Sequence, residues 1–331
     1  MIIHHLKKYI ELIIFIILAL LVFWLYKADF GQGKNPVFGV TFSQEYAVSL
    51  SADWHKMLTD ILDELKVKEF RLIAYWDLLE SFKDNYDFSD LDWQINEVAK
   101  RDGKIILAVG QRVPRWPECH WPAWIYQLSL EERQVKIESM IKEVVLRYKG
   151  NPAITAWQVD NEPFLSTFGE CPKLTKEDYK KEVALVRSLE SRPVIVTESG
   201  ELSTWLNGGR IADSLGTSIY RITWNKWFGY FYYPLPPAGY YLKAELIKKI
   251  TGIKSIFVSE LQMEPWLGMG VLQTPIEEQM KSMNLNQFNK NVIYAKATGL
   301  SPIYTWGVEW WYWLKEQGDP SLWEASKKLF P

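Results

Sequence analysis

The sequence predicts an α/β fold, a closed (β/α)₈ barrel of the TIM type, preceded by one N-terminal transmembrane helix. An apolar run near the N-terminus has nearly the length that a bilayer requires. Behind it, eight short apolar runs rich in β-branched residues alternate with amphipathic stretches, a pattern typical of a parallel sheet covered by helices. The 331 residues suffice for one such barrel, which takes about 250 residues.

The apolar run extends from Leu12 to Tyr26 and is preceded by Lys7 and Lys8. At about 1.5 Å per residue, a helix over this region is close to the lower limit for crossing a bilayer. A cleaved signal peptide is the alternative, but Tyr26 is bulky where cleavage requires a small residue. We therefore expect a signal anchor with the barrel outside the cytoplasm. The expected limits are a cytoplasmic tail (1–8), the transmembrane anchor (9–26), a linker (27–35) and the barrel (36–331).

The strands of the barrel are predicted from apolar runs that end in polar or aromatic residues. Amphipathic helices are predicted between them, for example over 128–148 and over 176–189, where Thr175 is the expected cap. A doubly wound sheet that binds a nucleotide would carry a Gly-rich turn after its first strand, and none is present. The eight predicted strands are 37–42, 70–76, 104–110, 153–160, 194–198, 215–220, 255–260 and 302–306.

Composition excludes several kinds of partner and cofactor. The net charge is −2 and charges of both signs are mixed, so we expect no nucleic-acid partner. Only four His are present, and His55 and His120 are far apart in the chain, which disfavours a metal-dependent hydrolase and a Ser-His-Asp triad. We expect no metal or organic cofactor, and a monomer. Seventeen Trp favour a ligand with C–H faces, such as a sugar, although barrel cores also contain Trp.

Two cysteines lie in Pro-flanked loops. Cys119 follows the third predicted strand and Cys171 follows the fourth, and these strands are neighbours in a barrel. In an exported protein two such residues indicate one disulfide. Two unrelated thiols are the alternative.

Carboxylates follow several predicted strands, at the end of the barrel where catalytic groups gather. Glu162 comes after the fourth strand and Glu260 ends the seventh. Acetal hydrolysis needs two carboxyl groups, one to protonate the leaving oxygen and one to attack or to activate water. A solvated position at the rim is the alternative for each. Glu264 is the rival to Glu260, while the roles of Glu198 and Glu309 stay open.

The triplet Asn161-Glu162-Pro163 after strand four, with Glu260 on strand seven, resembles glycoside hydrolase clan A, which includes families 5, 39 and 42. The resemblance covers the chain after residue 36. It implies that Glu162 is the general acid/base and Glu260 the nucleophile. Four further residues gain roles from the resemblance: Asn161 binds the sugar 2-hydroxyl, Arg71 and Tyr220 hold the nucleophile, and Trp306 stacks under the sugar. Without the resemblance, Arg71 could simply pair with a buried carboxylate, and Tyr220 and Trp306 could fill the barrel.

The expected function is hydrolysis of O-glycosidic bonds in an oligo- or polysaccharide, with retention of configuration. A transglycosylase would use the same carboxylates, and a non-catalytic carbohydrate-binding barrel would keep the aromatic residues. A purely structural role of the anchored domain is a further alternative.

The tether also predicts an orientation. Because the first strand starts soon after the anchor and is entered at the N-terminal face of a barrel, we expect the C-terminal face to point away from the membrane. The alternative is an aromatic belt that dips into lipid and turns that face toward the membrane. Its candidate members are Trp121, Trp124, Trp310, Trp311 and Trp313.

Overall fold

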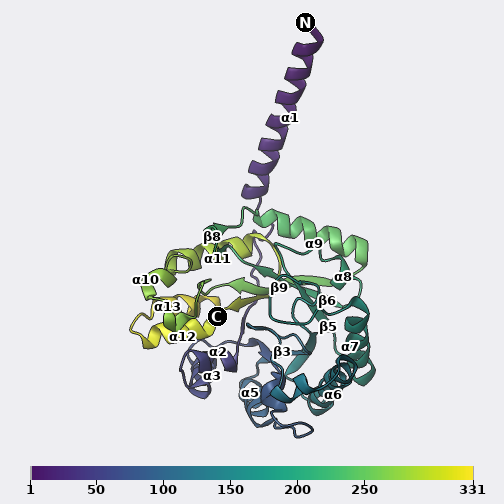
Figure 1. The fold of residues 1–331 in the computed structure, drawn as a ribbon. Coiled ribbons are helices and arrows are strands. Elements are labelled where there is room, and N and C mark those ends of the chain that lie inside the picture. Colours follow the sequence, from purple (N-terminus) through teal and green to yellow (C-terminus); the bar gives the residue numbers. More distant parts are fainter. Residues whose placement is uncertain (1, 331) are drawn as a thin grey trace.

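Eight parallel strands close a barrel in the computed structural model, which describes residues 2–330 (Figure 1). The ring closes where β1 pairs with β10, in a register that sets Phe38 beside Ile303 and Thr41 beside Trp306. The predicted fold is confirmed, and each predicted strand overlaps an observed one. The strands around the ring are β1 (Phe38–Thr41), β2 (Glu69–Ile73), β3 (Lys104–Val109), β4 (Ile154–Val159), β5 (Val194–Glu198), β6 (Ser214–Ile219), β9 (Ser255–Gln262) and β10 (Ile303–Trp306).

The strands are buried on both faces, which explains why they appear in the sequence as nearly continuous apolar runs. Their outward side chains pack against the helices. The inward apolar side chains form one small layer inside the ring. Buried polar side chains, such as those of Arg71 and Gln158, lie toward the C-terminal ends of the strands. The inner layer consists of Ile106, Ala156, Ile195, Phe257 and Tyr304.

Helices surround the ring. The two that the sequence predicts are present, and α6 begins with a capping box formed by Ser129 and Glu132, while Thr175 caps α7. The longer helices are α3 (Trp54–Asp63), α5 (Ser89–Ala99), α6 (Leu130–Tyr148), α7 (Lys176–Leu189), α9 (Pro237–Thr251), α11 (Leu285–Ala297) and α12 (Val308–Glu316). The shorter ones are α2 (Gln44–Ser49), α4 (Trp76–Leu79), α8 (Leu206–Gly209), α10 (Ile276–Gln279) and α13 (Ser321–Ser326).

An antiparallel hairpin follows β6 at the C-terminal end of the barrel. It consists of β7 (Ile222–Asn225) and β8 (Gly229–Tyr232). No pattern in the sequence predicts this hairpin. Because it leaves the end of a barrel strand, the hairpin forms part of the rim around the C-terminal face.

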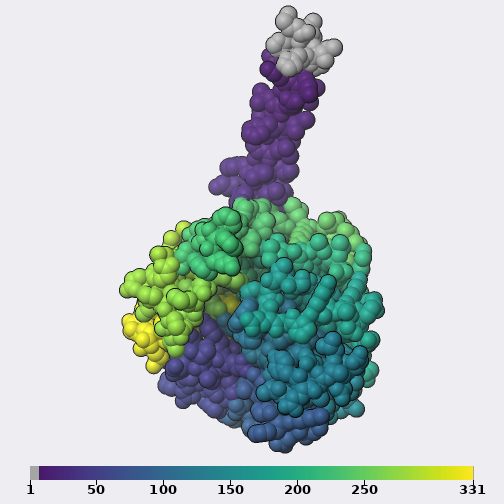
Figure 2. Space-filling model, viewed as in Figure 1, coloured from purple at the N-terminus to yellow at the C-terminus, as the bar shows by residue number. Residues whose placement is uncertain are grey.

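The N-terminal helix α1 (Ile2–Lys27) stands away from the barrel (Figures 1 and 2). Its segment Lys7–Lys27 is long and apolar enough to cross a membrane, with a mean hydropathy of 2.6, and none of it is buried against the barrel. The apolar helix expected from the sequence is therefore present. Its use as an anchor, and the domain limits 1–8, 9–26, 27–35 and 36–331, remain proposals.

The position of α1 corrects the expected orientation. Tyr26 Oη donates a 2.8 Å hydrogen bond to the Pro234 carbonyl, between β8 and α9, on the C-terminal side of β6. The linker then runs down the flank of the barrel, where Phe30 stacks on Tyr241 of α9 and its N–H bonds to Ala297 O. The expectation that the tether meets the barrel at its N-terminal face is wrong, because the end of α1 contacts the segment before α9 and the linker folds back along the flank.

Three of the five candidate members of the alternative aromatic belt are buried, while Trp124 and Trp313 are partly exposed. Trp310 and Trp311 are completely buried and Trp121 nearly so. Their rings contribute to the core under the rim and do not reach the surface.

Candidate active site

Glu260 lies near the end of β9, with both carboxylate oxygens held by side chains from other strands. Arg71 on β2 donates from Nη1 to Oε1 at 2.8 Å, and Tyr220, directly after β6, donates from Oη to Oε2 at 2.9 Å. Arg71 is fully buried, and its other nitrogens donate to Gln158 and Asn161 at 2.7 Å each. An arginine so fixed positions the carboxylate and compensates its charge.

Glu162 follows β4 and faces the same end of the barrel interior. Its backbone adopts a positive φ of 44°, and its N–H donates to Thr197 Oγ1 at 2.9 Å. Ser218 on β6 donates to Glu162 Oε1 at 3.3 Å and is the register partner of Glu260 on β9. Register partners on parallel strands point to the same side. Ser218 therefore links Glu162 to the strand position that carries Glu260.

The pKa of Glu162 is raised well above its usual value of 4.5. Burial is the main cause, followed by the negative charge of Glu260 and then of Glu118. Burial also raises the pKa of Tyr220 well above 10, so that its hydroxyl stays protonated and donates. The site thus combines one carboxyl group that resists ionisation with one carboxylate that is paired to an arginine.

Asn161 connects these groups through its side-chain amide. Its Oδ1 accepts from Arg71 Nη2 at 2.7 Å and from Thr197 Oγ1 at 3.0 Å, and its Nδ2 donates to Glu118 Oε1 at 3.2 Å. These bonds therefore fix the side-chain amide of Asn161 in one orientation. Asn161 precedes Glu162 in the chain and shares Arg71 with Glu260.

Glu118 is a site carboxyl group that the sequence analysis missed. It lies in the loop after β3, is buried, and pairs with Arg112 at 2.7 Å. Burial raises its pKa to about 8, against the opposing effect of Arg112. The sequence offers only one hint, its position next to Cys119, because no periodic pattern extends into this loop.

Arg115, in the same loop, was also missed. Its guanidinium lies 3.9 Å from the ring centroid of Tyr46 and 4.1 Å from that of Trp306, and it pairs with Glu264 and Glu309. One face of Trp306 is therefore covered by Arg115, and the residue as a whole is only 8% exposed.

Three other carboxylates near the strand ends form bonds within the protein. Glu264, the rival to Glu260, is paired with Arg115, as is Glu309, which also accepts from Ser43 N at 2.6 Å. Glu198 accepts from Trp205 N at 3.1 Å and from Gly208 N at 2.7 Å and so fixes the loop after β5. These contacts indicate structural roles.

Cys119 and Cys171 form the predicted disulfide, with Cα atoms 5.4 Å apart. Hydrogen bonds join the same two loops, from Arg112 Nη2 to Phe168 O at 2.6 Å and from Glu170 N to Pro117 O at 2.9 Å. The loop that carries Arg112, Arg115 and Glu118 is thereby fixed over the barrel end.

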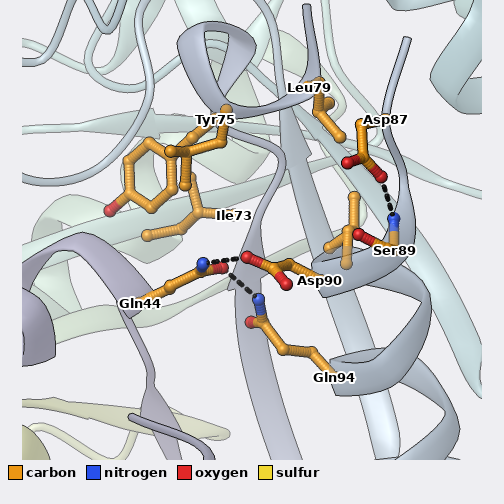
Figure 3. A pocket seen from close by; sticks show the side chains of 10 residues that line it. Gln44, Ile73, Tyr75, Leu79, Asp87, Ser89, Asp90 and Gln94 are labelled. Atoms are coloured by element: carbon orange, nitrogen blue, oxygen red, sulfur yellow. Dashed lines mark hydrogen bonds between the residues drawn. The ribbon is translucent and has the colours of Figure 1, made fainter. Parts of the chain in front are cut away.

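Two further polar groups lie near this end. In the part of the chain whose side chains are described, one trio could approach a metal ion, Glu45, Asp77 and His120, and His120 Nδ1 already pairs with Glu45 at 2.5 Å. A small pocket beside α5 is lined by polar side chains that bond to one another (Figure 3). There Gln44 donates to Asp90 at 2.5 Å and accepts from Gln94 at 2.8 Å, which indicates a structural network.

Comparison with known proteins supports the fold assignment. No known family profile matches the sequence. The β-galactosidase BgaA of Clostridium cellulovorans is 24% identical over 184 residues, and the match covers 46% of this chain and 27% of that protein. The matched region thus spans about a quarter of that curated relative.

Solved structures resemble this chain over most of its length. A cold-adapted β-galactosidase from Rahnella sp. R3 has a TM-score of 0.58 at 12% identity, over 89% of this chain and 55% of that one. An endo-β-1,4-xylanase of glycoside hydrolase family 10 from Gloeophyllum trabeum has a TM-score of 0.57 at 17% identity, over 89% and 96%. Xylanase 10B from Thermotoga maritima has a TM-score of 0.52 at 16% identity, over 82% and 83%. The clan A resemblance seen in the sequence is confirmed at the level of the fold, since this chain shares its barrel with these glycoside hydrolases.

Proposed function

We propose that the protein is a retaining glycosidase that hydrolyses O-glycosidic bonds in an oligo- or polysaccharide, with Glu260 as nucleophile and Glu162 as general acid/base. One observation carries the proposal. Glu260 is held by Arg71 and Tyr220, while Glu162, linked to the same strand position through Ser218, has a strongly raised pKa. A retaining enzyme needs this division between an ionised and a protonated carboxyl group.

In the first step Glu260 attacks the anomeric carbon, the glycosidic C–O bond breaks, and Glu162 gives its proton to the leaving oxygen. In the second step Glu162 takes a proton from water, the water oxygen bonds to the anomeric carbon, and the bond to Glu260 breaks. Negative charge returns to Glu260 in this second step. Arg71 and Tyr220 are placed to stabilise that charge through the hydrogen bonds that they already make.

The supporting residues have roles that their contacts limit. Asn161 uses Nδ2 for one bond to Glu118, so an amide hydrogen remains for a sugar 2-hydroxyl. Trp306 would stack on the sugar with the face that Arg115 does not cover. The β-galactosidases and xylanases that share the fold act on β-glycosides, which makes a β-linked substrate our first choice.

We further propose that residues 9–26 anchor the protein, with residues 1–8 in the cytoplasm, a linker over 27–35 and the barrel over 36–331 outside. The exposed apolar helix and the disulfide support this arrangement, because disulfides persist in oxidising compartments. Protease added to intact cells should remove the barrel. Protection of the barrel until the cells are lysed would place it in the cytoplasm.

The catalytic assignment is tested with a panel of aryl β-glycosides and polysaccharides. Glu260→Ala should abolish turnover and regain part of it with azide, which replaces the missing nucleophile. Glu264→Ala is the matched control, since that residue is also buried and paired to an arginine, and azide should not rescue it. Rescue of Glu264→Ala instead would move the nucleophile, while full activity of Glu260→Ala would refute the proposal.

A further inference from the structure

Exposed apolar side chains gather on the flank of the barrel from which α1 emerges. We call this set the lateral patch. In Figure 1 the hairpin strand β8, helix α9 and the base of α1 lie along one edge of the molecule, and Figure 2 shows the hairpin region beside that base. The lateral patch consists of Trp227, Phe228, Leu242, Leu246 and Ile250.

The α9 part of the patch points directly away from the barrel. Leu242, Leu246 and Ile250 are four residues apart and so share one face of the helix. The buried residues Tyr240, Ala244 and Ile247 occupy the opposite face. A helix of a water-soluble barrel normally presents polar residues outward, so this outward apolar row is unusual and indicates a contact surface.

The hairpin presents two aromatic side chains at its tip. Asn225 Oδ1 accepts from the backbone N–H groups of Trp227 at 3.0 Å and of Phe228 at 2.9 Å, which fixes the turn. The side chains of these two residues are nevertheless 78% and 84% exposed. At the base of the hairpin, Gln262 accepts from Arg221 N at 2.8 Å and from Ile222 N at 2.9 Å. The tip is therefore a hydrogen-bonded turn that projects two apolar side chains.

The tether places the lateral patch at the level of the membrane boundary. A helix over Lys7–Lys27 is about as long as the hydrocarbon core is thick, roughly 30 Å, so Tyr26 would lie at the interface. Tyr26 is hydrogen-bonded to Pro234, which separates the hairpin from α9. The stack of Phe30 on Tyr241 then fixes the linker to the same helix. No length of free chain is left between the membrane and this flank.

Basic side chains accompany the patch. Lys226 precedes the aromatic tip, Lys249 is exposed beside Ile250, and Lys27 ends α1. Aromatic side chains with flanking lysines are the residues that settle at a lipid headgroup layer, particularly one with anionic lipids.

We propose that the lateral patch lies on the membrane, with Trp227 and Phe228 in the headgroup layer of anionic phospholipids and α9 along the surface. The inference rests on the proposed anchoring by α1. Because the hairpin is part of the rim, the active site then opens next to the bilayer surface, and glycans close to that surface reach it first.

The test uses the full chain in nanodiscs of phosphatidylcholine and phosphatidylglycerol, with an environment-sensitive fluorophore on one introduced cysteine. The three variants are Phe228→Cys, Leu18→Cys in α1, and Phe82→Cys. Phe82 is the matched control, an exposed phenylalanine (74%) between α4 and α5, whose α5 lies on the far side of the barrel from α1. Unchanged thermal unfolding and an intact native disulfide are checked for each.

The expected result is a blue-shifted emission at positions 228 and 18, lost when spin-labelled lipids are included, and a water-like emission at position 82. A water-like label at 228 with a quenched label at 18 would overturn the lateral contact while keeping the anchor. Quenching at 228 without quenching at 18 would support the contact and refute the anchor, and quenching at neither would refute both. A blue shift at 228 that spin-labelled lipids do not quench would mean a protein partner and would overturn the lipid assignment.

Discussion

Replacing Tyr220 with phenylalanine removes one hydrogen bond from Glu260 and leaves the pair with Arg71 in place. The lost bond is 2.9 Å long and joins the hydroxyl of a partly buried tyrosine to a carboxylate oxygen. Hydrogen bonds to charged groups are worth about 1.5–3 kcal/mol. The loss falls on the step in which Glu260 leaves the sugar and recovers its charge, so we expect kcat to fall about 10- to 150-fold.

The kinetic pattern separates this role from a structural one. Because the second step is slowed most, the glycosyl-enzyme should accumulate, with a burst of released aglycone in a stopped-flow assay and a KM that falls together with kcat. Tyr179→Phe is the matched control, since its buried hydroxyl has no hydrogen-bond partner among the residues described. That variant should keep wild-type kinetics. A Tyr220→Phe enzyme with unchanged kcat, or with a lower kcat and no burst, would refute the assigned role of Tyr220.

Four further predictions concern pH and the disulfide. Activity requires protonated Glu162, so kcat/KM should decline only as pH rises through its raised pKa, well above the usual 4.5, and an alkaline limb near 4.5 would contradict this. Glu118→Gln should move that limb to lower pH where the limb lies above the Glu118 pKa of about 8, because only ionised Glu118 raises the pKa of Glu162; an unmoved limb in that range would contradict this effect. The same variant should flatten the dependence of stability on pH in thermal unfolding, since the raised pKa of Glu118 makes wild-type stability fall as pH increases from 4.5 to about 8. Replacing Cys119 and Cys171 with serine opens a loop with a sequence separation of 52 and should cost up to about 4 kcal/mol of unfolding free energy, whereas an unchanged melting temperature would show that the bond does not constrain the chain.

The strands were predictable because a barrel requires apolar strands and amphipathic helices to alternate regularly along the sequence. A strand buried on both faces must be apolar along its length, and a helix between strands must be amphipathic. Both patterns can therefore be recognised in one sequence. The positions of Glu162 and Glu260 at the C-terminal end of the barrel were predictable because they lie just after or near the ends of such strands. The caps Thr175 and Ser129 follow local rules in the same way.

The loops were not predictable for equally physical reasons. Glu118 and Arg115 reach the site through a loop whose path is set by positive φ values at both residues and by the disulfide, none of which produces a periodic pattern. Trp306 was correctly placed at a strand end, yet the guanidinium on one of its faces comes from this distant loop. The path of the tether was not predictable for a similar reason. The length of the linker limits how far it can reach but does not determine which flank of the barrel Phe30 contacts.

The central claim is that Glu260 forms a covalent bond to the sugar, and trapping that bond tests it most directly. The full-length enzyme would be incubated with an activated 2-deoxy-2-fluoroglycoside of a sugar that it hydrolyses, a reagent that forms the glycosyl-enzyme faster than water removes it. Intact mass spectrometry should show the addition of one fluoroglycosyl group, and peptide mapping should locate it on Glu260. A label on Glu264 or another residue, or no label together with a product of inverted configuration in NMR spectra, would contradict the proposed mechanism.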